Sequence, residues 1–158
     1  MASIRRIDHV AIAVKDADEA TQQFVKLLNA VHVRTEILHE KAGDVKVSYL
    51  QLGENVISLA QSMEPDGFLN KHIEKHGEGL HHMGLEVDDL NEFVSEVEGK
   101  GLKIPLRDEF SNRSEVVLRP KDAAGVILQI VQWNGGWDVS VEERIERIRK
   151  LENQPKKA

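Results

Sequence analysis

The chain has 158 residues, a net charge of −6 and no cysteine. Its length fits a single domain over 1–158 with a substantial core. The absence of cysteine excludes a disulfide scaffold, a zinc-thiolate site, an iron–sulfur cluster and a catalytic thiol.

Charge and hydropathy narrow the class of protein further. Lysines and arginines are scattered along an acidic chain, so we expect no binding to nucleic acid. No uncharged apolar run reaches the roughly 18 residues of a membrane span, and the first residues lack the apolar stretch of a signal peptide. We therefore expect a soluble cytoplasmic protein without a membrane partner.

The first predicted elements form a module over about 4–62. Alternating apolar residues in "DHVAIAVKDA" (8–17) predict a strand with one buried face. Asp16 can cap the helix that follows, because a side-chain oxygen satisfies free N–H groups of the first turn. Three β-rich segments then close the module, over 30–40, 44–53 and 55–61.

A short helix over about 65–77 is predicted to connect this module to the next. It carries His72 and His76, whose i, i+4 spacing is that of a metal-binding pair. No third ligand is near them in the sequence, so we interpret the pair as solvated surface.

The second module, about 79–133, repeats the first. At a shift of 73 positions "DHVAIAVKDA" matches "HHMGLEVDDL", so that His9 falls on His82 and Asp16 on Asp89. A helix and three β-rich segments follow, predicted over 102–106, 114–120 and 125–132. The fold class predicted is α+β, with the order strand, helix, three strands occurring twice.

The repeat equates two further positions, and strand geometry removes one histidine from the candidate site. Aligning the closing strands places Ser58 on Gln129. His81 should point away from His82, because successive strand residues face opposite sides of a sheet.

The C-terminal segment, about 138–153, lies outside the repeat. Ser140 and Glu143 form a capping-box pattern, and apolar residues follow at helical spacing. We expect a helix that packs on its own domain or on a partner subunit.

Three segments of the repeat resemble a known superfamily. A duplicated strand-helix-three-strand unit with a histidine in each first strand resembles the vicinal oxygen chelate superfamily, which includes glyoxalase I, extradiol dioxygenases and fosfomycin resistance proteins. "IDHVAIAVKDADEA", "GEGLHHMGLEVDDL" and "RPKDAAGVILQIVQ" are most similar to methylmalonyl-CoA epimerases. The resemblance covers roughly 4–133 and implies duplicated βαβββ modules, a curved mixed sheet with a cleft, and a homodimer.

The resemblance also implies site residues. The epimerases bind a divalent metal through four strand residues, which match His9, Ser58, His82 and Gln129 here; two ligand types are kept and two are changed. The family's two catalytic glutamates fall on Lys46 and Gln129. We therefore expect a metal at His9, His82 and Gln129, with Ser58 facing the substrate. Because no ligand is anionic, a transition metal such as zinc, cobalt, nickel or iron suits this set better than magnesium or calcium.

The basic residues at matching positions allow two interpretations each. Lys46 could act on the substrate as a base or an anion clamp, or it could be a solvated lysine on the opposite face of its strand. Arg119 and Lys121 match the basic residues before the last strand of the epimerases, and could hold a carboxylate or CoA phosphates, or could belong to an ordinary turn.

The function that follows is an expectation. We expect a metal-dependent isomerase or epimerase that acts on a CoA thioester or related 2-substituted acid through an enolate, with Lys46 and Gln129 as catalytic residues. Two alternatives stay open: a metal-poor protein of the same fold that binds a small ligand, and a ring-cleaving dioxygenase-like enzyme that uses His9 and His82.

Overall fold

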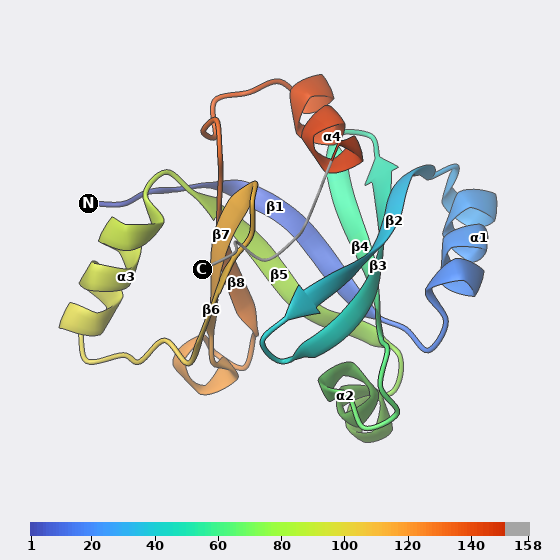
Figure 1. Cartoon of the computed structure of the whole chain (residues 1–158), viewed down its shortest axis with the longest axis horizontal. Coiled ribbons are helices and arrows are strands. Elements are labelled where there is room, and N and C mark those ends of the chain that lie inside the picture. Colours follow the sequence, from blue (N-terminus) through green and yellow to red (C-terminus); the bar gives the residue numbers. More distant parts are fainter. Residues whose placement is uncertain (151–158) are drawn as a thin grey trace.

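The computed structural model describes residues 1–150 as one curled, eight-stranded mixed sheet surrounded by helices (Figure 1). The strand order is β2-β3-β4-β1-β5-β8-β7-β6. The first half comprises β1 (Ile4–Ala13), α1 (Ala17–Leu28), β2 (Val31–Glu40), β3 (Gly43–Leu52) and β4 (Asn55–Ser62). After α2 (Phe68–His76), the second half comprises β5 (Gly79–Val87), α3 (Leu90–Gly99), β6 (Leu106–Glu109), β7 (Arg113–Leu118) and β8 (Leu128–Trp133), and α4 (Val141–Arg149) follows. The predicted α+β fold with two βαβββ modules is confirmed.

Several helix boundaries follow the predicted capping residues. The Asp16 side chain accepts hydrogen bonds from the backbone N–H groups of Asp18 and Glu19, and Asp89 accepts one from Glu92. Ser140 and Glu143 form the predicted capping box at the start of α4. Residues 151–153 of the predicted C-terminal helix lie outside the described residues.

One predicted strand was wrong. We expected a strand over 102–106, but β6 begins at Leu106 and runs to Glu109. Pro105 precedes it, and proline lacks the N–H that a sheet ladder needs and restricts the residue before it. The strand therefore starts only after the proline.

The two halves join through β1 and β5, which pair antiparallel at the centre of the sheet. In the first half Ala11 pairs with Ser58, and in the second half Gly84 pairs with Gln129. Since Ala11 and Gly84 are themselves 73 positions apart, the register confirms that Ser58 and Gln129 are equivalent.

Three apolar clusters hold the sheet and helices together. One lies between α1 and the first half of the sheet, and a second between α3 and the second half. In Figure 1, α1 and α3 lie at opposite ends of the molecule. The third cluster joins residues of β1, β2, β3, β4 and β8 to α2 and α4. None of the helices in residues 1–150 has the length and apolar character that crossing a membrane requires.

Candidate functional site

A cavity of about 320 Å³ lies within the curl of the sheet and receives side chains from both halves. Much of its wall is apolar, with Val45, Val47, Val131 and Trp133 among the contributors. Five residues predicted for the site line it: His9, Ser58, His82, Arg119 and Gln129.

Two β-bulges bring additional polar residues to this wall. Between the pairs Ile7–Leu85 and His9–Gly84 the extra residue is Asp8, and between Ala11–His82 and Ile12–Leu80 it is His81. A bulge interrupts the alternation of side chains, so Asp8 and His9 both line the cavity, as do His81 and His82. The expectation that His81 points away from its neighbour was therefore wrong.

The repeat contained a signal for this arrangement. At the shift of 73 positions Asp8 falls on His81, so each half contributes a pair of adjacent polar residues at the same place. Strand alternation alone hid the second member of each pair.

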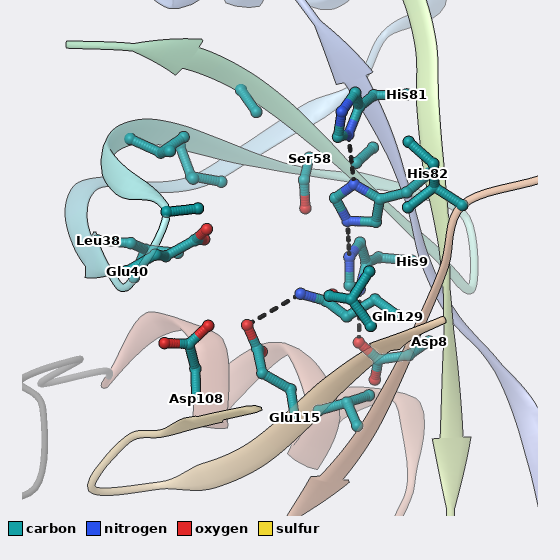
Figure 2. A pocket seen from close by; sticks show the side chains of 18 of the residues that line it. Asp8, His9, Leu38, Glu40, Ser58, His81, His82, Asp108, Glu115 and Gln129 are labelled. Atoms are coloured by element: carbon teal, nitrogen blue, oxygen red, sulfur yellow. Dashed lines mark hydrogen bonds and ion pairs between the residues drawn. The ribbon is translucent and has the colours of Figure 1, made fainter. Parts of the chain in front are cut away.

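The imidazoles form a row along one wall (Figure 2). His9 Nε2 lies 3.2 Å from His82 Nε2, and His82 Nδ1 lies 2.9 Å from His81 Nδ1. His9 Nδ1 lies 2.8 Å from Asp8 Oδ2. Since an ionised carboxylate can only accept, His9 carries its proton on Nδ1, and in its neutral form it keeps a lone pair on Nε2.

Asp8 is itself held in place from behind. Trp133 Nε1 donates to Asp8 Oδ1 at 2.8 Å, and the carboxylate is buried. Burial alone would raise the pKa of Asp8, but the hydrogen bonds from His9 and Trp133 hold it below its ordinary value. The carboxylate is therefore ionised at neutral pH and fixes the His9 ring, as carboxylates do behind metal-binding histidines.

The other two histidines of the row are kept neutral. Burial, with smaller contributions from His9 and His81, lowers the pKa of His82 well below its ordinary value, although a hydrogen bond with Gln129 opposes this. Burial and His72 lower the pKa of His81 to about 4. Neutral imidazole is the form that binds metals.

Gly84 gives the His9 ring its space. A Cβ atom on Gly84 would lie 2.3 Å from His9 Cε1 and 2.5 Å from His9 Nδ1. Any side chain at this position would overlap the imidazole, so the observed position of the ring requires glycine opposite it in the ladder.

Gln129 stands beside a buried carboxylate that the sequence did not reveal. Its Nε2 donates to Glu115 Oε1 at 2.9 Å, while Arg113 Nε donates to Glu115 Oε2 at 2.9 Å. Glu115 is on β7, diagonally across the ladder from Gln129, because Val117 is the direct partner of Gln129. Gln129 itself carries no charge. The carboxylate of Glu115 on the neighbouring strand therefore supplies the negative charge at this point.

Glu40, at the end of β2, faces the histidines from the other side of the cavity (Figure 2). Burial, followed by the negative charges of Glu115 and Asp108, raises the pKa of Glu40 to about 8. No motif in the sequence marks this residue, because the carboxylates near it, Glu115 and Asp108, come from the other half of the sheet.

Two predicted residues lie away from the cavity. Lys46 Nζ lies 2.5 Å from Asp18 Oδ2 of α1, and Val45 and Val47 are the neighbours that line the cavity. Its strand therefore directs the lysine to the opposite face, which is one of the two interpretations left open. Lys121 is exposed and does not line the cavity.

Arg119 and the histidines of α2 complete the surroundings. Arg119 lines the cavity and forms an ion pair with Asp122 at 2.9 Å. His72 is only partly exposed, contrary to the expectation for a solvated pair, because its ring lies 4.7 Å from that of His81 and 4.6 Å from that of His76.

The histidine pair fits two ligand positions of a transition metal. Ligands about 2.0–2.1 Å from one ion at octahedral or tetrahedral angles are separated by roughly 2.8–3.4 Å, and His9 Nε2 and His82 Nε2 are 3.2 Å apart. In residues 1–150 no three His, Cys, Asp or Glu side chains are grouped so as to hold a metal. A third protein ligand would be a neutral group, and Gln129, the amide beside His82, is the candidate predicted from the sequence.

Sequence comparison finds one matching family model and several similar proteins. Residues 8–114 match the model of the Glyoxalase/Bleomycin resistance protein/Dioxygenase superfamily. The chain is 31% identical to human mitochondrial methylmalonyl-CoA epimerase over 138 residues, which cover 82% of this chain and 75% of that protein. It is 23% identical to the uncharacterized protein YqjC of Bacillus subtilis, over 84% of this chain and 95% of that protein.

Solved structures share the fold. A variant of Streptomyces coelicolor methylmalonyl-CoA epimerase in complex with 2-nitronate-propionyl-CoA matches with a TM-score of 0.76 at 23% identity, over 84% of this chain and 99% of that chain. A hypothetical protein from Bacillus halodurans matches with a TM-score of 0.75 at 26% identity, over 85% of this chain and 98% of that chain.

Proposed function

Because the chain belongs to the Glyoxalase/Bleomycin resistance protein/Dioxygenase superfamily, we propose that it catalyses epimerisation or a related isomerisation of a CoA thioester, by proton transfer at the carbon next to the thioester carbonyl. The observation that carries the proposal is the His9–His82 pair, whose Nε2 atoms are 3.2 Å apart in a cavity that Gln129 and Glu115 also line. The likeness to methylmalonyl-CoA epimerases supports the choice of substrate class.

This reaction has three requirements. A base removes the α-proton, an electrophile stabilises the enolate that forms, and an acid returns a proton on the other face. A divalent metal held by His9, His82 and Gln129 would supply a Lewis acid for the enolate oxygen.

The protein side chains prepare this wall of the cavity. Asp8 orients His9 and keeps its Nε2 directed at His82. Burial keeps His82 neutral. Glu115 holds the Gln129 amide, and together with Asp8 it places negative charge behind a ligand set that has none of its own.

Isotope exchange tests the proposal directly. The purified protein is incubated with methylmalonyl-CoA in deuterated water after loading with zinc, cobalt, nickel or iron(II), and α-deuteration is followed by mass spectrometry. We expect exchange with at least one metal, and loss of exchange in His9→Ala and His82→Ala. Lys46→Met is the control variant and should retain exchange, because Lys46 pairs with Asp18 away from the cavity.

Other outcomes would point to other activities. Oxygen uptake with catechols in the iron(II) protein would indicate a dioxygenase-like reaction instead. Absence of α-proton exchange with every metal, with less than about a tenth of an equivalent of metal bound, would favour a small-ligand-binding protein and overturn the proposal. We also propose a homodimer, which light scattering of the purified protein tests.

A further inference from the structure

We propose that Glu40 is a catalytic residue that exchanges a proton with the substrate α-carbon from the wall opposite His9 and His82. This inference rests on the proposed function and adds to it the group that acts on the second face of the enolate. Lys46, which the sequence offered for a catalytic role, lies on the other side of the sheet.

The position of Glu40 carries the argument. Leu38 and Glu40 line the cavity, while His39 between them turns away and pairs with Asp44 at 2.9 Å. Figure 2 shows the Glu40 carboxyl group across the cavity from the row of histidines, with space between them for a substrate. A group on each side of a planar enolate is the arrangement that inversion of the α-carbon requires.

The tip of the β2–β3 hairpin is fixed where it carries Glu40. Glu40 pairs with Gly43 across the turn, and the backbone N–H of Lys41 donates to Asp108 Oδ1 on β6 at 3.2 Å. Edge strands of the two halves, β2 and β6, therefore meet at this point. The contact ties the end of β2, which carries Glu40, to the second half of the sheet.

The charges around Glu40 favour its protonated form. Burial is the largest cause that raises the pKa of Glu40, the charges of Glu115 on β7 and Asp108 on β6 raise it further, and Arg113 on β7 opposes them, with a result of about 8. Other titratable groups on its own hairpin and around the cavity include His39, Lys41, Asp44, Tyr49, Asp8, His9, His81, His82 and Arg119. At neutral pH Glu40 is therefore a neutral acid beside a space where an anion forms.

The proton transfer balances without a further reagent. In one direction the O–H bond of the Glu40 carboxyl breaks and leaves a carboxylate, the C=C electron pair of the enolate forms the new C–H bond, and a lone pair of the enolate oxygen re-forms the thioester C=O. In the other direction the Glu40 carboxylate takes the α-proton and the enolate forms. The proton on the opposite face is exchanged by a second group of the cavity wall.

Glu40→Gln tests the assignment by turnover. We expect epimerisation to fall by about 10²- to 10⁴-fold, the usual contribution of a positioned acid or base, with a smaller change in KM. α-Deuteration should be lost from one epimer of methylmalonyl-CoA and retained from the other, because the second face keeps its own group. The matched control is Asp44→Asn, a carboxylate on the same hairpin that does not line the cavity, and it should behave as wild type.

A binding measurement tests the role of Glu40 separately from the proposed function. The probe is 2-nitronate-propionyl-CoA, an anionic analogue of the enolate, titrated calorimetrically into wild type and Glu40→Gln at pH 6.5 and pH 9. If protonated Glu40 donates to the bound anion, wild-type affinity should fall by about tenfold or more between the two pH values relative to the variant, the cost of losing one hydrogen bond to a charged group.

The outcomes are distinct. Wild-type exchange together with equal exchange of both epimers by Glu40→Gln, and parallel pH dependence of analogue binding, would overturn the role of Glu40 and leave the proposed function in place. A wild-type protein that neither exchanges the α-proton nor binds the analogue would overturn both.

Discussion

At the scale of single residues, the space at Gly84 determines whether His9 can occupy its position. We predict that Gly84→Ala will displace the His9 imidazole, because the new Cβ would lie 2.3 Å from its Cε1. Overpacking of this kind costs about 1–3 kcal/mol, and the His9–His82 alignment would be lost. Urea unfolding measures the stability, and metal titration followed by elemental analysis should show weaker metal retention.

Gly99→Ala is the matched control for that substitution. Gly99 is the last residue of α3, no atom lies within 4 Å of its added Cβ, and its backbone is not in the left-handed region. Alanine in a helix is favoured over glycine by about 0.5–1 kcal/mol, so stability should be unchanged or slightly higher. Equal metal retention by Gly84→Ala and wild type would contradict the steric argument.

The residues of the site differ in how far the sequence could predict them. His9, His82, Ser58 and Gln129 were predicted to share a site from the resemblance to the epimerases, the repeat equates them in pairs, and all four line one cavity. Glu115 could not be predicted in this way, since its relation to Gln129 is a diagonal contact between neighbouring strands. Its partner is set by sheet register, which no local pattern of β7 reveals.

At the scale of elements, α4 forms part of the cavity wall and belongs to the packing of its own chain. Arg144 Nη2 donates to the backbone oxygen of Asp8 at 3.1 Å, and Arg147 Nη2 lies 3.0 Å from Glu86 Oε1. Ile145 and Ile148 join the cluster that contains Trp133. The sequence left open whether this helix packs on its own domain or on a partner, and these contacts show packing on its own domain.

Ile148→Ala tests that role of α4. Ile148 is buried and lines the cavity, so truncation should lower the free energy of unfolding by about 2–4 kcal/mol, as lost transfer and cavity terms add. Urea unfolding followed by circular dichroism measures the loss. Arg149→Ala, on the exposed side of the same helix, should change stability by no more than about 0.5 kcal/mol. Equal losses in the two variants would show that α4 is not packed as described.

Element prediction succeeded where periodicity was regular and failed where it was interrupted. The N-caps at Asp16 and Ser140 were correct because capping depends on local chemistry. The bulges at Asp8 and His81 were missed, because a bulge adds a residue to one strand relative to its partner. Such an offset exists only in the pair of strands, so it is not visible in either segment alone.

At the scale of the whole molecule, the two halves share one architecture but contribute different chemistry. The first half supplies Asp8, His9 and Glu40, and the second supplies His82, Glu115 and Gln129. Neither half contains a complete site, and the cavity exists only because the sheet curls until β2–β3 approaches β6. Because Glu40 lies where the two halves meet, its protonation state and the stability of the curled sheet are linked.

That linkage predicts how stability depends on pH. The pKa of Glu40 is raised from an ordinary 4.5 to about 8 in the folded chain, so between these values the folded state holds a proton that the unfolded state has lost. The contribution of Glu40 is fully present below about pH 4.5 and is lost as the pH rises through 8. Glu40→Gln removes this dependence, so the variant should gain on wild type as the pH increases. We expect a relative gain of about 1–3 kcal/mol between pH 5 and pH 9, discounted for partial exposure. Urea unfolding at each pH, with a chelator present, measures the difference; stability curves that remain parallel would show that Glu40 is not held in its acid form.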